Sequence, residues 1–150
     1  MMNLAAVLPQ FLPGAIAWAE ARSRLALETG MPLTQQGLAD ARSVGVFVPE
    51  NIRVSIVTSL PLPEDSALRD IALGTGLLGP RFTGLTLGYA IFIVQGYETR
   101  RLFTHECRHV YQYEKAGSIA QFLPDYLQQI ASVGYEEAPL EVDARQHEFD

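Results

Sequence analysis

The chain has 150 residues, a length that fits one domain able to bury most of the surface its unfolded form would expose. Hydrophobic residues make up 48% and charged residues 19%, which is a globular rather than a disordered balance. The net charge of -6 argues against a nucleic-acid partner, because phosphate binding requires a basic surface. The single cysteine, Cys107, excludes an internal disulfide and a cysteine-rich zinc site.

The N-terminal stretch, residues 1–23, is apolar enough to be considered as a signal peptide. It has no positive residue before its apolar part, however, and Pro9, Pro13 and Gly14 interrupt that part. The rest of the chain contains no run of about eighteen uninterrupted apolar residues. We therefore expect a soluble, cytoplasmic protein without a membrane span.

The first half of the chain predicts mainly helices. Residues 15–29 are rich in helix formers, and a second helix is expected over residues 34–45 with Thr34 as its N-cap. The alternation over residues 52–60 predicts a strand, and residues 65–73 a short capped helix. Residues 1–50 are thus a mainly helical N-terminal portion.

The second half opens with a glycine-rich segment, residues 74–88. It lacks the Lys-Ser/Thr pair of a phosphate loop and the spacing of a dinucleotide fingerprint, so a turn-rich connection is expected there. Residues 85–97 are β-branched and aromatic with almost no charge, which predicts one strand. A helix should follow from Glu98 or Thr99 to Ala116.

Two further helices are expected near the end of the chain. Ser118 can act as a cap, and Pro124 fits the first turn of a helix that Gly134 ends. Pro139 fits the first position of a last helix over residues 139–149.

The sequence HECRH at residues 105–109 lies in the helix predicted from Glu98 or Thr99 to Ala116. Positions i and i+4 of a helix share one face, so His105 and His109 can bind one metal ion. Glu106 is rotated by about 100° from His105, which places its carboxylate beside the ion as a base for water. Cys107 is expected to be a small buried side chain.

A catalytic zinc also requires a third protein ligand. The metzincin pattern fails, because Gln112 and Lys115 stand where it requires glycine and histidine. Glu141 is favoured, since it lies about one turn into the helix opened by Pro139 and the small Ala144 would let that helix pack closely. The candidates for this ligand are Glu136, Glu137, Glu141 and Asp143, and His147 is the least favoured candidate.

The segments at residues 103–117 and 134–145 together resemble the small gluzincin-type zinc metallopeptidases, or minigluzincins. The resemblance covers about residues 85–148, the expected metal-site core, and residues 1–50 resemble no family. It implies a zincin-like α+β fold, in which the strand at residues 85–96 lies at a sheet edge over the active-site helix and can pair with an extended substrate. The positions that carry the resemblance are His105, Glu106, His109, Gln112, Pro139, Glu141 and Ala144.

The function we expect is hydrolysis of peptide bonds with one Zn²⁺ held by His105, His109 and Glu141, and with Glu106 as the base. Tyr135 is the candidate donor to the developing oxyanion, and Asp143 or Asp125 could orient a zinc-bound histidine. The expected partners are a peptide or protein substrate and a further protein that supplies specificity. Two alternatives stay open: a non-catalytic zinc-binding or protein-interaction domain, and a helical structural protein without metal.

Overall fold

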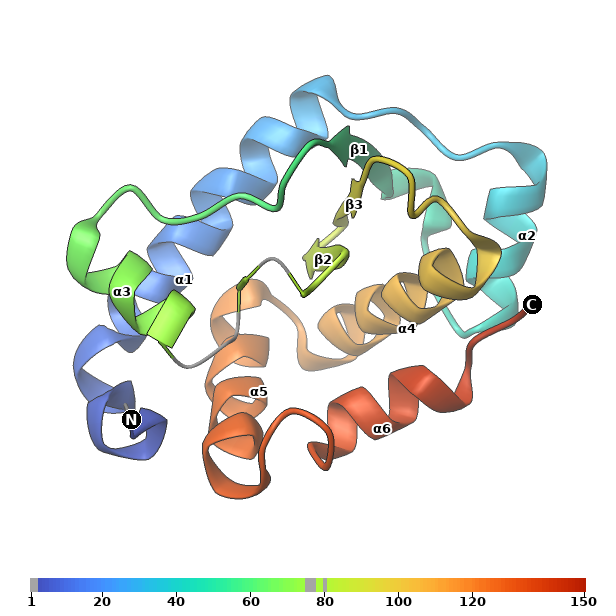
Figure 1. Cartoon of the computed structure of the whole chain (residues 1–150). Coiled ribbons are helices and arrows are strands. Elements are labelled where there is room, and N and C mark those ends of the chain that lie inside the picture. Colours follow the sequence, from blue (N-terminus) through green and yellow to red (C-terminus); the bar gives the residue numbers. More distant parts are fainter. Residues whose placement is uncertain (1–2, 75–77, 80) are drawn as a thin grey trace.

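The computed structural model describes residues 3–74, 78–79 and 81–150. Within these residues, six α-helices surround a three-stranded mixed sheet, so the predicted α+β class is confirmed (Figure 1). The elements are α1 (Leu4–Thr29), α2 (Gln35–Ser43), the short 3-10 helix η1 (Pro49–Asn51), β1 (Arg53–Val57), α3 (Ser66–Gly74), β2 (Gly84–Leu87), β3 (Ala90–Val94), α4 (Arg100–Ala116), α5 (Ile119–Val133) and α6 (Pro139–Gln146).

The sheet has the strand order β1-β3-β2, with β3 parallel to β1 and antiparallel to β2. Because side chains alternate across a strand, β3 contributes to two apolar clusters. Phe92 packs in the cluster that includes α1 and α5, and Ile91 and Ile93 pack in the cluster that includes α2 and α4. This explains why β3 is a continuous apolar run.

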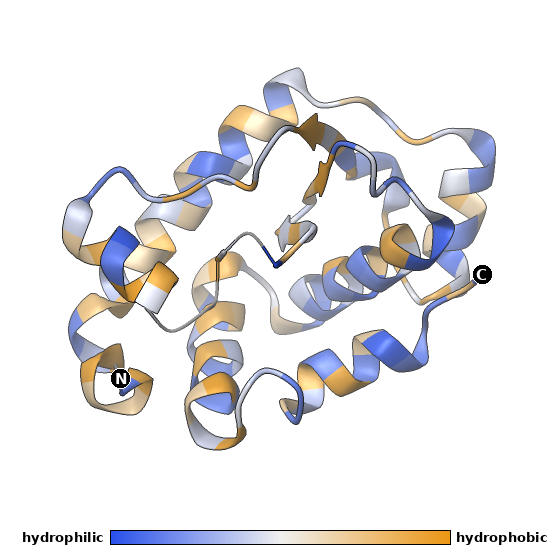
Figure 2. Cartoon of the chain, in the orientation of Figure 1, coloured by the Kyte–Doolittle hydropathy of each residue, from blue (hydrophilic) through white to orange (hydrophobic). Residues whose placement is uncertain are grey.

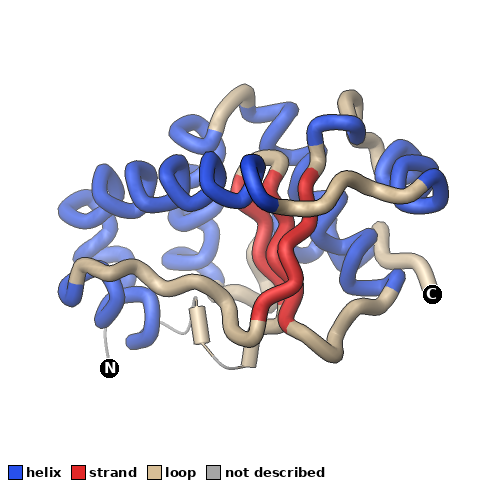
Figure 3. The backbone as a smooth tube through the Cα atoms, turned by 90° about the horizontal axis from the view of Figure 1, so that it is seen from above, coloured by secondary structure: helices blue, strands red, loops and turns tan. Residues whose placement is uncertain are grey.

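Helices cover both faces of the sheet. Helix α1 crosses the strands on one face, where Ala19 and Ala26 are buried and the Ser23 hydroxyl donates to the Leu87 carbonyl at 2.8 Å (Figure 3). On the other face, the fully buried Cys107 and Val110 of α4 pack against the sheet. Strand β3 consists of apolar residues, whereas much of α4 is hydrophilic (Figure 2). Helix α4 therefore packs against the sheet through an apolar face and carries polar side chains on the rest of its surface.

The strand predicted at residues 85–97 is wrong in one respect, because the chain folds there into a hairpin. Strands β2 and β3 are joined by the two-residue turn Gly88–Tyr89, and Leu87 pairs with Ala90. Gly88 has a φ of 66°, as the first central position of a type II′ turn requires. The hairpin makes β2 an edge strand among the described strands and brings it beside α4.

Helix α1 begins earlier than its predicted start at Ala15. Asn3 caps it by accepting a hydrogen bond from the Ala5 N–H, and the helix continues through Pro9 and Pro13. By length and composition alone, α1 is long and apolar enough to cross a membrane. Buried helices of globular folds and N-terminal signal sequences have the same character, so the absence of a span stays a prediction.

Two helix boundaries near the end of the chain also differ from expectation. Helix α5 is capped by Ser118 and already includes Pro124 in its interior, not in its first turn. Helix α6 ends at Gln146, three residues before the predicted end. Residues 147–150 leave the helical path, and the Phe149 N–H donates to the Thr104 hydroxyl at 2.9 Å. The segment after α6 thereby packs on the start of α4.

Candidate metal centre

The two histidines of HECRH lie on one face of α4. This helix is well delimited, since Thr99 caps its start by accepting from the Leu102 N–H and Gly117 ends it with a φ of 110°. His105 and His109 are buried, and their ring centroids are 5.0 Å apart. A regular helix thus presents two imidazoles side by side, as the i, i+4 spacing predicts.

Glu141, in the first turn of α6, completes a buried triad with these histidines. Its Oε1 lies 3.2 Å from His105 Nε2, and its Oε2 lies 3.2 Å from His109 Nε2. The side chain of Glu141 is almost fully enclosed, and Ala144, one turn later, is completely buried where α6 packs on α4. The sequence arrangement of HExxH with a downstream glutamate is therefore matched in space.

The triad fits a single metal ion. One ligand atom from each residue can be chosen so that all three lie within 4.8 Å of one another. Metal–ligand bonds of about 2.0–2.1 Å in a tetrahedron place ligand atoms about 3.3 Å apart. Two imidazoles and a carboxylate form a donor set that zinc accepts, with a fourth position for water or substrate. The donor set permits one ion and does not by itself identify it.

The charges of the triad are strongly coupled. Burial lowers the pKa of His105, but the hydrogen bond to Glu141 and the charge of Glu106 outweigh it and raise this pKa to about 9. For His109, burial again lowers the pKa, and Glu141 shifts it above its ordinary value. Burial would raise the pKa of Glu141, yet the two histidines hold that pKa well below its usual range. The pocket favours positive charge, which a divalent cation can supply in place of protons.

A carboxylate outside the triad orients His105. The Nδ1 atom of His105 lies 2.8 Å from Glu148 Oε2, so an Nδ1–H donating to Glu148 leaves Nε2 free to bind metal. Arg101 donates to the other oxygen of Glu148 at 3.1 Å. Sequence reasoning missed Glu148, because a helix continuing to Phe149 would have carried it along α6.

His109 is oriented by a side-chain network between α4 and α6. Its Nδ1 lies 2.8 Å from Gln112 Oε1, again consistent with an Nδ1–H donor and a free Nε2. The Gln112 amide donates to Asp143 Oδ2 at 2.9 Å, and Arg108 donates to both oxygens of Asp143 at 2.7 and 3.2 Å. Asp143 therefore reaches His109 through Gln112. Arg108, which carried no signal in the sequence, anchors this network.

The carboxylate of Glu141 has its own partner in α5. The Tyr126 hydroxyl donates to Glu141 Oε2 at 2.7 Å. Burial raises the pKa of Tyr126, and the nearby charge of Glu141 adds to this shift, so the hydroxyl keeps its proton and acts as a donor. The sequence contains several tyrosines near the motif and gave no signal that singled out Tyr126.

Glu106 lies against the edge strand β2. The Thr86 hydroxyl is 2.7 Å from Glu106 Oε1, which it can reach as a donor. A Cβ atom added at Gly84 would lie 2.7 Å from Glu106 Oε2, closer than side chains tolerate. The Thr86 hydroxyl thus fixes the carboxylate of Glu106. Gly84 leaves the space that this carboxylate occupies. Both were missed, because the sequence did not show which residues of this strand face α4.

The remaining candidates are placed as follows. Tyr135 lines the cavities beside the triad, where burial raises the pKa of its hydroxyl and Glu141 adds to the shift. Glu136 and Glu137 are exposed in the turn before α6, and Asp125 is exposed on α5. His147 is half-buried, and its Nδ1 lies 2.8 Å from the Asp143 carbonyl oxygen. The structure therefore brings only Glu141 of the candidate third ligands into the triad.

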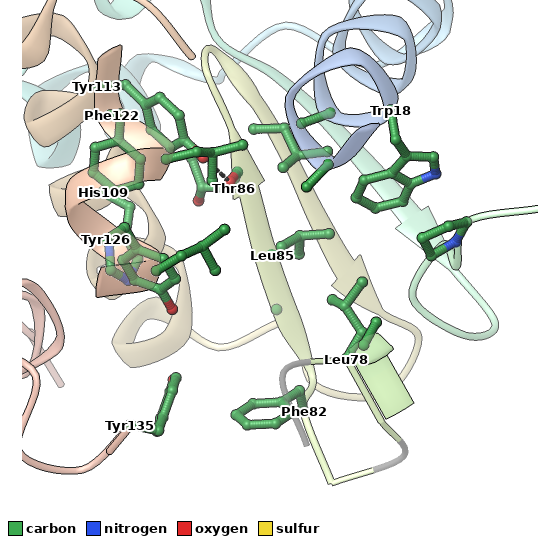
Figure 4. Close-up of a pocket in the computed structure, with 18 of the residues that line it drawn as sticks. Trp18, Leu78, Phe82, Leu85, Thr86, His109, Tyr113, Phe122, Tyr126 and Tyr135 are labelled. Carbon is green, nitrogen blue, oxygen red and sulfur yellow. Dashed lines mark hydrogen bonds between the residues drawn. The ribbon is translucent and has the colours of Figure 1, made fainter. Parts of the chain in front are cut away.

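Two cavities meet at Glu106. The first, which we call the apolar chamber, has a volume of about 130 Å³ and is bordered at one end by Glu106, His109 and Glu141. Figure 4 shows His109 and Tyr126 beside β2 and Trp18 of α1 across the strand from them. The second is a more polar groove of about 370 Å³ that is also lined by Glu106 and adds His105. The buried triad therefore contributes residues to the lining of both cavities.

Comparisons with protein-family models, with curated proteins and with solved structures found no match for the chain. What links it to HExxH metal sites is the arrangement of its own residues, a buried triad of His105, His109 and Glu141 that could hold one metal ion.

Proposed function

We propose that the protein is a zinc-dependent peptidase that hydrolyses peptide bonds with Glu106 as its base. The single observation that carries this proposal is the buried triad of His105, His109 and Glu141 with a fourth, non-ligating carboxylate at the same cavity. A purely structural zinc site is normally closed by four protein ligands. Here only three candidate ligands converge among the described residues, and the site adjoins two cavities.

The residues around the triad can be assigned separate roles in the proposed reaction. Zinc bound there would polarise the substrate carbonyl and lower the pKa of water towards about 7. Glu106 would accept the proton of the attacking water and then deliver it to the leaving amine nitrogen. The Thr86 hydroxyl would hold Oε1 of Glu106, so that Oε2 remains the oxygen that exchanges the proton. Tyr135 is the proposed donor to the developing oxyanion.

Strand β2 supports an extended peptide as the substrate. It pairs with β3 on one side only among the described strands, so its other edge can add a substrate strand. Gly84 and Thr86 on this strand both meet Glu106. A peptide paired with β2 would pass close to the proton-accepting carboxylate.

The test is the substitution Glu106→Gln, assayed on a mixed library of internally quenched peptides in the presence of zinc. We expect the variant to keep one zinc per chain and to lose at least about a hundredfold in kcat/KM, since a positioned base contributes about 10²–10⁴-fold. Glu137→Gln, at an exposed position in the turn before α6, is the matched control and should keep full activity. Equal activity of wild type and Glu106→Gln would refute the proposed role.

One observation favours a second candidate, a zinc site that only stiffens the fold. The network from His109 through Gln112 and Asp143 to Arg108 ties α4 to α6, which are the two helices that supply the triad. In that case zinc would bind and raise the melting temperature, but neither wild type nor Glu137→Gln would cleave any peptide of the library. The same experiment therefore separates the two candidates.

A further inference from the structure

The apolar chamber changes character along its length. At the triad its lining is polar, with Glu106, His109 and Glu141. Away from the triad, Leu85 and Leu127 and the residues of α1 and α3 form an apolar wall. The carboxylates of Glu106 and Glu141 are the only acidic groups in this lining, and no lysine or arginine contributes to it among the described residues. A polar reacting group and an apolar substituent can thus be accommodated side by side.

The size of the chamber determines which amino-acid side chain it can hold. Its volume of about 130 Å³ is close to that of an engineered apolar cavity of about 150 Å³ that binds benzene. A phenyl or leucyl side chain fits such a space, whereas an alanine methyl group would leave most of it unfilled. A charged side chain would lose its hydration there without a partner of opposite sign on the apolar wall.

The far wall comes from the part of the chain that lies outside the metallopeptidase-like region. Phe11, Ala15 and Trp18 of α1 line the chamber, together with Leu68 of α3. In Figure 4, Trp18 approaches from α1 on the side of β2 opposite His109 and Tyr126, and Leu85 lies between the two groups. Without α1, the chamber would be open on this side.

We propose that α1 is a specificity element: it closes the apolar chamber into a side-chain pocket, so that the protein selects peptides with a phenylalanine- or leucine-sized side chain next to the bond to be cleaved. The selection of a bond for cleavage rests on the proposed peptidase function. The binding component stands independently, because it concerns the chamber and not the reaction.

Trp18 makes the binding component directly measurable, because it is the only tryptophan of the chain and lines the chamber. The experiment uses zinc-loaded Glu106→Gln protein, in which turnover is blocked, and titrates N-acetyl-4-bromophenylalanine amide. The bromine atom quenches indole fluorescence at short range, so we expect saturable quenching of Trp18. N-acetylalanine amide should give none. Equal or absent quenching by the two amides would overturn the proposal.

Variants of α1 give the sharper test. Ala15→Leu adds bulk to the chamber wall and should weaken binding of the bromophenyl probe at least tenfold. Ala17→Leu places the same change on an exposed position of the same helix and should leave binding unchanged. Melting temperatures of both variants establish that the fold persists. Phe11→Ala removes bulk from the wall, enlarges the chamber and should shift preference towards N-acetyl-2-naphthylalanine amide. If Ala15→Leu and Ala17→Leu bind the probe equally, α1 does not set the pocket.

An activity assay separates failure of this inference from failure of the proposed function. We expect wild type to cleave peptides with phenylalanine or leucine at the selected position about ten- to a hundredfold faster, in kcat/KM, than peptides with alanine there. Cleavage without any side-chain preference would sink the specificity inference and leave the peptidase proposal intact. The opposite result is no cleavage of any peptide, together with saturable quenching of Trp18 that Ala15→Leu weakens. It would refute the peptidase proposal and support a side-chain pocket closed by α1.

Discussion

His105 Nδ1 lies 2.8 Å from Glu148 Oε2, although 43 residues separate them in the chain. The contact exists because α6 ends at Gln146 and the following residues turn back towards the start of α4. Arg101 donates to Glu148 and to Asp150, which holds the returning segment in place. One short segment thereby fixes the orientation of a proposed metal ligand.

The first prediction concerns this contact. Glu148→Ala should weaken zinc affinity about 10- to 100-fold, because the imidazole of His105 loses the acceptor that fixes its ring and tautomer. Glu148→Gln keeps a carbonyl oxygen as acceptor and loses only the charge, so it should weaken the affinity less. Competition with a chromophoric chelator measures the affinity. Glu137→Gln serves as the control, as an exposed glutamate of the preceding turn. Unchanged affinity in Glu148→Ala would show that the contact does not support the site.

The second prediction concerns the hydroxyl that holds Glu106. Thr86→Val keeps the shape of the side chain and removes the donor to Glu106 Oε1. We expect kcat for peptide cleavage to fall about tenfold while zinc content stays at the wild-type value, since a hydrogen bond to a charged group contributes about 1.5–3 kcal/mol. Thr58→Val, at an exposed position, is the control. A loss of zinc in Thr86→Val would mean that Thr86 supports the fold of the site and not the base.

The third prediction concerns the close approach of β2 to the base. In Gly84→Ala the new methyl group would lie 2.7 Å from Glu106 Oε2 and 3.0 Å from Leu102 Cδ1, so the carboxylate or the strand must move. Peptide cleavage should fall by about tenfold or more, because misplacing a reacting group by about 1 Å costs up to about 100-fold. Gly14→Ala meets no atom within 4 Å and should keep full activity. Full activity in both variants would contradict the assigned position of Glu106.

The sequence predicted the centre of the site well, because local rules determine it. The i, i+4 spacing placed His105 and His109 on one face, and Pro139 at a helix start placed Glu141 one turn later. Both helices appear with these residues facing one another. Cys107 is buried in the core, as expected for a small apolar side chain.

The surrounding residues depend on boundaries that local rules place less well. An edge strand over the active-site helix was expected, but the prediction of one strand at residues 85–97 hid the turn at Gly88. It therefore did not show that only β2 lies at the edge, or that Thr86 faces Glu106. The predicted end of α6 at Phe149 hid the return of Glu148. A shift of a few residues in a turn or a helix end decides which side chains meet, and tertiary packing sets that shift.

The fourth prediction concerns stability and pH, at the ion pair that joins α2 to α4. The Arg100 guanidinium donates to both oxygens of the buried Asp40 at 2.8 and 3.0 Å, and this hydrogen bonding holds the Asp40 pKa below its usual range. A carboxyl whose pKa is lower in the folded state stabilises the fold above its unfolded pKa of about 3.9 and loses this contribution as pH falls through the folded pKa.

Asp40→Asn should therefore lower the free energy of unfolding by about 1 kcal/mol at pH 7, a modest value because half of the Arg100 side chain is exposed. The difference between wild type and variant should shrink below about pH 4. Urea unfolding of both proteins at pH 7, 5 and 3.5 measures it. A difference that stays constant over this range would show that the charge of Asp40 is not its source.

The most direct measurement of the central claim is the zinc content of purified wild type, Glu106→Gln and Glu141→Ala after loading and removal of free metal. We predict about one zinc per chain in wild type and in Glu106→Gln, because His105, His109 and Glu141 are the proposed ligands. It predicts a marked loss in Glu141→Ala, with the helical content of that variant checked by circular dichroism. A wild type without zinc, or an undiminished zinc content in Glu141→Ala, would contradict the account.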